Sequence, residues 1–277
     1  MIAWLTTLVT LVSASGPFTY QPVGQLQADA AGYVSDDALI PGMQFPLESA
    51  PAYANSQVYG HGGYHGPGGG QCDAENYSYP WWDNYCEPRS WSMPLCPSGT
   101  GHQGQDIRPS TCDNDTHWAV AAEAGTITNI GSYSVYLTTP AGVRHRYLHM
   151  KPSSLQVSYG DWVNRGDRLG RVSNTFFDSS GNPVPTTIHL HYDIRMNVQS
   201  VGGNAYVSPY LSLVESYETL LGAEAEPCGV VASAGGDLDD GGPCFSRWGS
   251  ADYWRSVSGA GEGGGFIWTN GWESETP

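Results

Sequence analysis

The sequence predicts a mainly β protein built on an antiparallel sheet, of the β-sandwich or half-barrel type, with long loops and one C-terminal helix. Three observations predict this class. Short β-branched and aromatic runs, separated by Gly and Pro, fill the stretch 115–195. Within it, TTIHLHYDI at 186–194 alternates polar and apolar side chains. A single helical pattern follows, at 208–222.

The first strands are predicted from β-rich runs bounded by Gly and Pro. Consecutive antiparallel strands are expected at 124–131, 133–142 and 143–150. The stretch 159–173 repeats a Gly-Asp pair around Val163 and Leu169, which is typical of a tight turn followed by another strand. A polar loop at 174–186 then leads into TTIHLHYDI.

Period-two alternation divides TTIHLHYDI into two faces. His189, His191 and Asp193 share one face. The other face is apolar and suits a core: Ile188, Leu190, Tyr192 and Ile194.

The helix at 208–222 starts at a Ser-Pro pair and stops at Gly222. Its apolar positions recur at helical spacing: Leu211, Val214, Tyr217, Leu220 and Leu221.

The predicted organisation has five parts. The apolar run 1–16, ending in small residues, predicts a signal peptide; a buried strand is the alternative. A Pro/Gly-rich segment at 17–71 precedes the main domain at 72–222. An acidic Gly/Ala linker at 223–243 leads to 244–277, which we interpret as the start of a truncated accessory β module.

Charge excludes two classes of partner. The 277 residues include 11 Lys and Arg against 27 Asp and Glu, a formal net charge of −16. Nucleic-acid binding and polybasic membrane contact both need clustered cations, so neither is predicted. For the same reason we expect no basic docking patch. No stretch after the first 16 residues is long and apolar enough to span a bilayer.

Six cysteines behind a predicted signal indicate disulfides and a secreted or periplasmic protein. We expect two disulfides among Cys72, Cys86, Cys96 and Cys112, with their pairing open, and a third between Cys228 and Cys244. No C-x-x-C is present, so neither a thiolate zinc knuckle nor a thioredoxin-type pair is indicated.

Two further histidine clusters precede TTIHLHYDI. In TGHQGQDIRP, His102 and Asp106 share a face of an extended segment, and Gly104 leaves a gap that suits two ligands converging on one ion. With a histidine from TTIHLHYDI they would supply the three ligands of a catalytic zinc. In VRHRYLHM, His145 and His149 fall on one strand face.

HQGQDI, YLHM, YGDWVNRGDRLG and IHLHYDI, in this order over about 100–195, resemble the lysostaphin-type zinc endopeptidases that cut peptidoglycan peptides. The resemblance implies zinc ligands His102, Asp106 and His191. It implies that His149 and His189 orient or deprotonate the attacking water and stabilise the oxyanion.

The resemblance implies a secreted Zn²⁺ endopeptidase whose partner is the peptide of bacterial peptidoglycan; nothing indicates the oligomeric state. Asp193 would orient one of the histidines. The alternative is a catalytically inactive homologue that binds cell wall or a protein partner. A serine hydrolase is not favoured, because no G-x-S-x-G is present. SSGNPVPTTI replaces the Gly-rich segment that many members have before H-x-H, so substrate specificity is open.

Several aromatic residues stay outside this assignment. We predict an exposed His145 and a solvated loop around His61 and His65, with adventitious metal binding as the alternative for that loop. Packing, rather than a sugar-stacking surface, is expected for Trp81, Trp82 and Trp91. His117 has no assignment.

Overall fold

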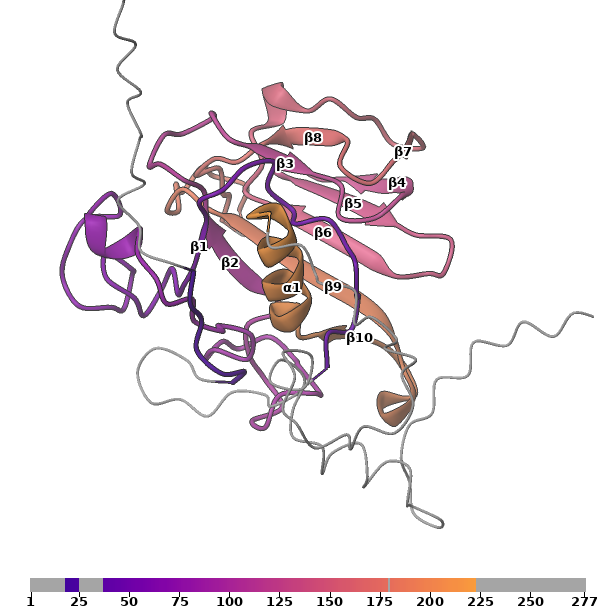
Figure 1. The fold of residues 1–277 in the computed structure, drawn as a ribbon, viewed down its shortest axis with the longest axis horizontal. Helices are drawn as coiled ribbons and strands as arrows, with labels where there is room; N and C mark the ends of the chain where they lie inside the picture. Colours follow the sequence, from indigo (N-terminus) through magenta and orange to yellow (C-terminus); the bar gives the residue numbers. More distant parts are fainter. Residues whose placement is uncertain (1–17, 25–36, 179, 223–277) are drawn as a thin grey trace, which may run out of the picture. The chain divides into compact units, whose positions relative to one another are not determined.

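A computed structural model describes residues 18–24, 37–178 and 180–222 (Figure 1). An eight-stranded sheet has the order β1-β2-β9-β6-β5-β4-β7, with β10 paired to β9, and a two-stranded sheet joins β3 to β8. Every pairing between named strands is antiparallel. The strands are β1 Tyr53–Ala54, β2 Gln105–Arg108, β3 Trp118–Val120, β4 Gly125–Ile130, β5 Ser134–Thr138, β6 Arg144–Leu148, β7 Trp162–Val163, β8 Arg168–Arg171, β9 Leu190–Val198 and β10 Gly203–Val207.

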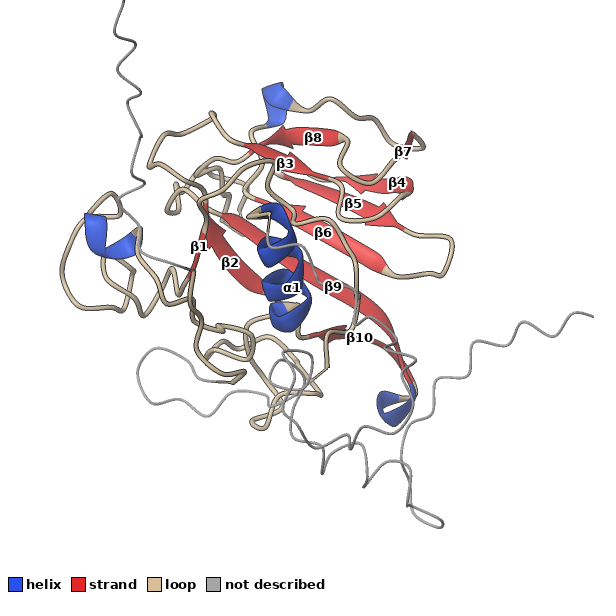
Figure 2. Cartoon of the chain, viewed as in Figure 1, coloured by secondary structure: helices blue, strands red, loops and turns tan. Residues whose placement is uncertain are grey.

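The predicted fold class is confirmed. Strands β4, β5 and β6 occupy the three β-rich runs and pair in sequence order. One α-helix, α1 Tyr210–Leu220, forms where the helical pattern predicts it, and three short 3-10 helices complete the described elements: η1 Ala74–Asn76, η2 Pro152–Ser154 and η3 Gln199–Val201 (Figure 2). None of the helices within the described ranges has the length and apolar character needed to cross a membrane.

The core lies on one face of the large sheet. Leu190, Tyr192 and Ile194 of β9 are fully buried there, so the apolar face expected for TTIHLHYDI is the core face. Helix α1 contributes Leu213 and Tyr217 to the same core. Figure 1 shows α1 lying across β9 and β2. The opposite face of β9 is therefore left for polar side chains.

The segment before the predicted main domain also enters the core. Phe45 and Leu47 are buried in it, and β1 pairs with β2 through Tyr53 opposite Arg108. Residues 37–71 thus belong to the same packed body as the strands that follow. The domain boundaries stay predictions, and the parts expected at 1–16, 223–243 and 244–277 lie outside the described residues.

Two disulfides form within the first cysteine cluster, as predicted. They pair Cys72 with Cys112 and Cys86 with Cys96. The expected Cys228–Cys244 bond lies outside the described residues. Both bonds lie in segments that hydrogen-bond to the chain beside the predicted site residues: the Cys86 backbone N–H donates to the His102 carbonyl, and Gln71, next to Cys72, accepts from the Ile188 backbone N–H.

Candidate metal centre

The structure brings together the three residues predicted as metal ligands. His102 Nε2 lies 2.9 Å from His191 Nδ1, and Asp106 Oδ1 lies 3.0 Å from His191 Nδ1 and 3.4 Å from His102 Nε2. All three residues are buried, and each offers a ligand atom within 4.8 Å of the others. One small ion would be within reach of all three.

Strand pairing sets two of these positions. Asp106 of β2 stands directly opposite His191 of β9, and such pairs place their side chains on the same sheet face. His102 reaches them from the segment before β2, across Gly104. A Cβ at Gly104 would lie 2.2 Å from the Tyr192 carbonyl oxygen. The gap expected at Gly104 is therefore filled by the backbone of β9. The missing side chain allows the chain before β2 to approach β9 closely.

The outer ring nitrogens of the two histidines fix their tautomers. His102 Nδ1 lies 3.0 Å from the Asn84 carbonyl oxygen, and His191 Nε2 lies 3.1 Å from Asp193 Oδ2. A carbonyl and a carboxylate only accept, so these nitrogens carry the hydrogens. The inner nitrogens of the neutral rings then present lone pairs to each other and to Asp106. Three buried lone-pair atoms that face one another without a hydrogen between them would be stabilised by a cation. Two histidine nitrogens and a carboxylate oxygen are metal ligands suited to Zn²⁺.

Asn84 is a site residue that the sequence analysis missed. Its Nδ2 donates to Asp106 Oδ2 over 2.9 Å, and its Oδ1 accepts from the Asp106 backbone N–H over 3.1 Å. Its carbonyl holds His102, as described above. The adjoining chain is paired too, because the Cys86 backbone N–H donates to the His102 carbonyl over 3.0 Å. In the sequence, Asn84 lies in the aromatic, cysteine-bearing stretch YPWWDNYC, where no spacing rule connects it to Asp106.

The two histidines predicted to act in catalysis lie beside the three predicted ligands. The ring centroids of His149 and His189 are 4.4 Å apart, and His189 Nε2 is 3.5 Å from Asp106 Oδ1. The Nδ1 of His149 lies 3.0 Å from the Thr175 carbonyl oxygen, and that of His189 lies 2.9 Å from the Thr187 carbonyl oxygen. Each Nδ1 is therefore the donor in the neutral ring, and each Nε2 is left as an acceptor.

His149 reaches this face through a backbone reversal. Strand alternation would place it on the face of His145 and Tyr147, which faces the core, but β6 ends at Leu148 and His149 has φ 63°. This left-handed conformation is held by Ser173, whose backbone N–H and Oγ–H both donate to the His149 carbonyl over 2.8 Å. The shared face predicted for His145 and His149 was wrong.

His145 is fully buried, so the prediction of an exposed residue was also wrong. Its Nε2 lies 2.7 Å from Glu123 Oε2 and its Nδ1 lies 2.6 Å from the Tyr192 hydroxyl. Both ring nitrogens are paired on the core side of the sheet. This pairing explains how a polar ring is accommodated there.

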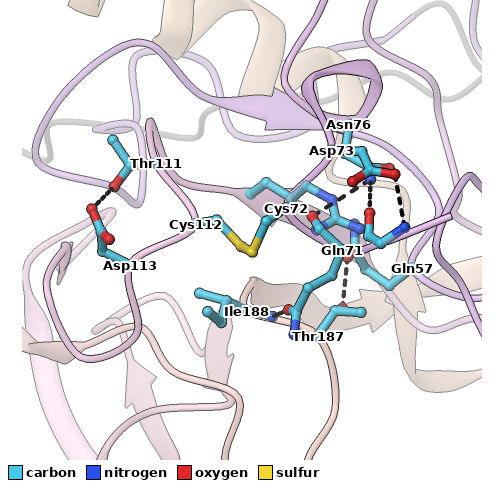
Figure 3. The surroundings of a disulfide bond; sticks show 12 residues. Gln57, Gln71, Cys72, Asp73, Asn76, Thr111, Cys112, Asp113, Thr187 and Ile188 are labelled. Carbon is cyan, nitrogen blue, oxygen red and sulfur yellow. Dashed lines mark hydrogen bonds between the residues drawn. A yellow bond between two sulfur atoms is a disulfide. The ribbon is translucent and has the colours of Figure 1, made fainter.

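A disulfide-tied loop supports the segment before His189 (Figure 3). Gln71, next to Cys72, accepts from the Ile188 backbone N–H at its Oε1 over 2.8 Å. The Thr187 hydroxyl donates to Gln57 Oε1 over 2.7 Å. The chain that carries His189 is thus held at Thr187 and at Ile188 by residues from the N-terminal part.

The electrostatics favour a cation at the three predicted ligands, with neutral histidines at positions 149 and 189 beside it. Burial raises the pKa of the Asp106 carboxyl, but the neighbouring histidines hold it well below its usual range. Burial lowers the pKa of His191, but hydrogen bonds to Asp106 and Asp193 outweigh burial and raise it. Burial lowers the pKa of His189 to about 4, against the attraction of Asp106. Burial and the adjacent His189 lower the pKa of His149 well below its ordinary value.

Asp193 is itself held in place. Its side chain is completely buried and forms an ion pair with the Arg146 guanidinium. Arg146 also donates to Gln103 Oε1 over 2.7 Å. The predicted partner of a site histidine is therefore the middle of a chain that runs from Arg146 through Asp193 to His191.

The remaining aromatic residues have mixed positions. Trp81 is fully buried and donates from Nε1 to the Ala52 carbonyl over 2.8 Å, as packing predicts. Trp91 is 48% exposed, and its ring centroid lies 6.5 Å from that of His102. His61 is paired with Asp73 and Glu75 at 2.8 Å and 2.9 Å.

Comparison with known proteins agrees with the sequence motifs. Residues 100–202 match the family model of Peptidase family M23. No curated protein matches the chain. Among solved structures, the catalytic domain of the antimicrobial peptidase lysostaphin from Staphylococcus simulans is 20% identical; the match covers 47% of this chain and 89% of that chain, with a TM-score of 0.34.

Two other solved structures are similar. A protein assigned as the glycyl-glycine endopeptidase lytM of Ruminococcus gnavus is 24% identical; the match covers 42% of this chain and 47% of that chain, with a TM-score of 0.37. The M23 metalloprotease pseudoalterin from the deep sea is 25% identical; the match covers 47% of this chain and 72% of that chain, with a TM-score of 0.32. Together with the ordered histidine motifs, the match to the family model identifies residues 100–202 as a segment of the lysostaphin type of Peptidase family M23.

Proposed function

We propose that this protein is a secreted zinc endopeptidase that hydrolyses peptide cross-links of bacterial peptidoglycan. The observation that carries the proposal is the convergence of His102 Nε2, Asp106 Oδ1 and His191 Nδ1, with two further neutral histidines beside them. Such a centre needs a cation, and its flanking histidines are suited to moving protons. A sheet that served only for binding would need neither.

Zinc is the metal that these donors favour. Peptidases of family M23 are typically zinc-dependent, and His102, Asp106 and His191 would hold the ion. When bound, Zn²⁺ polarises the scissile carbonyl and lowers the pKa of the attacking water. The hydrogen bonds from His102 to Asn84 and from His191 to Asp193 keep both rings aimed at the ion.

His149 and His189 would carry the proton transfers. Both rings are neutral near pH 7 because their pKa values are lowered, so each Nε2 is a free acceptor. A neutral imidazole can take a proton from the attacking water and return it to the leaving amine. Once protonated at Nε2, either ring would also stabilise the oxyanion. The two rings are close enough to share these roles.

The substrate class comes from the proteins that this chain resembles. Lysostaphin is an antimicrobial peptidase, and the Ruminococcus gnavus protein is assigned as a glycyl-glycine endopeptidase. The two disulfides suit an oxidising compartment, which supports a site of action outside the cytoplasm. We infer that peptidoglycan peptides are the substrate.

The test is digestion of purified sacculi by the protein, with fragment masses as the readout. We expect new amino termini from peptide-bond cleavage, their loss with a chelator, and their return when Zn²⁺ is added. Elemental analysis should find one zinc per chain in the wild type and none in His191→Ala. Tight sacculus binding without fragments, in a zinc-loaded protein, would instead favour a non-catalytic wall-binding homologue.

A further inference from the structure

Three arginines gather on the sheet face that carries the metal centre. In the register of β6 and β9, Arg146 stands opposite Asp193, and Arg144 stands opposite Arg195. Opposed residues share a sheet face, and every second residue along β9 returns to it. Arg144, Arg146 and Arg195 therefore extend the face of His191 toward one end of the two strands. Composition predicts no basic patch, yet the fold brings together three of the 11 basic residues.

Two of the three guanidinium groups are not neutralised. The ion pair described above occupies Arg146. Among the described residues, the arginines that form ion pairs with carboxylates are Arg89, Arg146 and Arg168. Arg144 and Arg195 have no such partner, and Arg144 Nε is buried with no hydrogen-bond acceptor. In a protein with a net charge of −16, positive charge is thus left free on the sheet face that carries the proposed metal centre.

Two tyrosines hold these guanidinium groups in place. The Arg144 guanidinium lies 5.3 Å from the ring centre of Tyr136 and 5.5 Å from that of Tyr206, and it donates to the Tyr206 hydroxyl over 3.2 Å. The Arg195 guanidinium lies 5.9 Å from the Tyr206 ring. Stacking on rings restricts the long side chains before a ligand arrives, so less conformational entropy remains to be lost on binding.

The spacing places this cluster within reach of an extended substrate. Arg195 follows His191 by four residues, which is about 13 Å along a strand that rises ~3.3 Å per residue. An extended peptide covers about the same distance per residue. Because an arginine side chain can lean along the strand, a group two to four residues from the scissile bond would meet these guanidinium groups.

We propose that Arg144 and Arg195 form a subsite that binds a carboxylate of the peptide substrate, two to four residues from the scissile bond. A planar guanidinium donates two parallel hydrogen bonds to a carboxylate, which makes carboxylates its natural ligand. The carboxylate is an acidic side chain or a free chain terminus. This inference rests on the proposed peptidase function and adds the charge of the substrate to it.

The test compares cleavage of matched peptides. One carries an acidic residue at each of these positions in turn, the second carries the corresponding amide, and the third ends there in a free carboxyl group. We expect kcat/KM for the acidic peptide to exceed that of the amide about tenfold, the range of a hydrogen bond between charged groups. The third peptide shows whether a chain terminus serves as well as a side chain.

Variants assign the preference to the cluster. In Arg144→Gln and in Arg195→Gln the ratio of kcat/KM between acidic and amide peptides should fall toward one. Arg165→Gln is the matched control: its guanidinium contacts the Gly42 carbonyl at 2.8 Å on an exposed turn, and the ratio should stay at the wild-type value. Thermal unfolding of each variant checks the fold, and Arg195→Gln serves if Arg144→Gln does not fold.

Failure of the subsite and failure of the proposed function give different results. If the wild type cuts acidic and amide peptides equally, or if the ratio survives in both arginine variants, the subsite is overturned and the peptidase stands. If zinc-loaded protein cuts neither peptide, the proposed function is overturned. Calorimetric binding of the same peptides then decides the subsite: an acidic preference lost in the arginine variants supports it, and equal or absent binding overturns it.

Discussion

Replacing Asn84 with Ala removes a support of two predicted metal ligands at once while leaving every predicted ligand in place. The variant loses the bond from Asn84 Nδ2 to Asp106 Oδ2 and the acceptor for the Asp106 backbone N–H. The Asn84 carbonyl that holds His102 is part of the backbone and remains, but the side chain no longer fixes its position relative to Asp106.

The expected magnitude follows from these contacts. A hydrogen bond to a charged carboxylate contributes about 1.5–3 kcal/mol and a neutral one about 0.5–1.5 kcal/mol, so the variant should lose about 2–4 kcal/mol in total. Part of this loss lowers the free energy of unfolding. The rest loosens Asp106, and loss of an outer partner typically weakens metal binding about 10–100-fold. We expect a zinc Kd in Asn84→Ala raised by about that factor.

Competition with a chromophoric chelator measures the zinc Kd, and denaturant unfolding of the metal-free protein measures stability. Asn55→Ala is the matched control, because Asn55 is also buried and its side chain donates to Asn76 and accepts from Arg108. It should cost a similar free energy of unfolding and leave the zinc Kd unchanged. Wild-type zinc affinity in Asn84→Ala, or an equal change in both variants, would refute the positioning role.

Three other predictions test the site and its frame. His191→Ala should contain no zinc by elemental analysis, whereas His149→Ala should keep zinc and lose turnover by about 10²–10⁴-fold, as expected for general acid–base catalysis; zinc loss in the His149 variant would contradict the assignment. Burial raises the pKa of Asp83 from 3.8 to about 7. Its stabilising contribution is therefore complete below pH ~4 and lost as pH rises toward 7, so the free energy of unfolding should decline over that window in the wild type and less in Asp83→Asn. The Cys72–Cys112 bond closes a separation of 40 residues. Replacing both cysteines with Ala should lower the free energy of unfolding by about 4 kcal/mol in a denaturant titration, and an unchanged midpoint would argue against the bond.

Most of the sheet could be predicted because its signals are local. The runs that became β4, β5 and β6 are bounded by turn residues, and the alternation around His191 marks which side of β9 faces the core. The three predicted ligands and the two predicted catalytic histidines lie together in the structure because their motifs place them on or next to β2, β9 and β6, which are neighbours in the sheet. Their roles as ligands and proton carriers remain proposals.

What could not be predicted depends on single backbone reversals and distant contacts. One left-handed residue, His149, turns its side chain from the core to the site, and no periodic pattern encodes such a step. His145 lies within the regular part of β6, so its side chain keeps the strand alternation and is buried on the core side, where it pairs with Glu123. Asn84 and Asp106 are 22 residues apart, with no spacing rule that would pair them.

The support from Asn84 and Gln71 bears on how the part of the chain that carries the predicted site can be divided or transplanted. The segment that matches the family model begins at residue 100, so a fragment cut there would keep the ligands and discard both supports. Such a fragment would leave Asp106 Oδ2 and the Ile188 backbone N–H without the partners that they have now. Because Gln57 also holds Thr187, the smallest fragment that keeps all these contacts starts upstream of Gln57. A chimera that joins another protein at residue 100 must supply its own replacement for these loops.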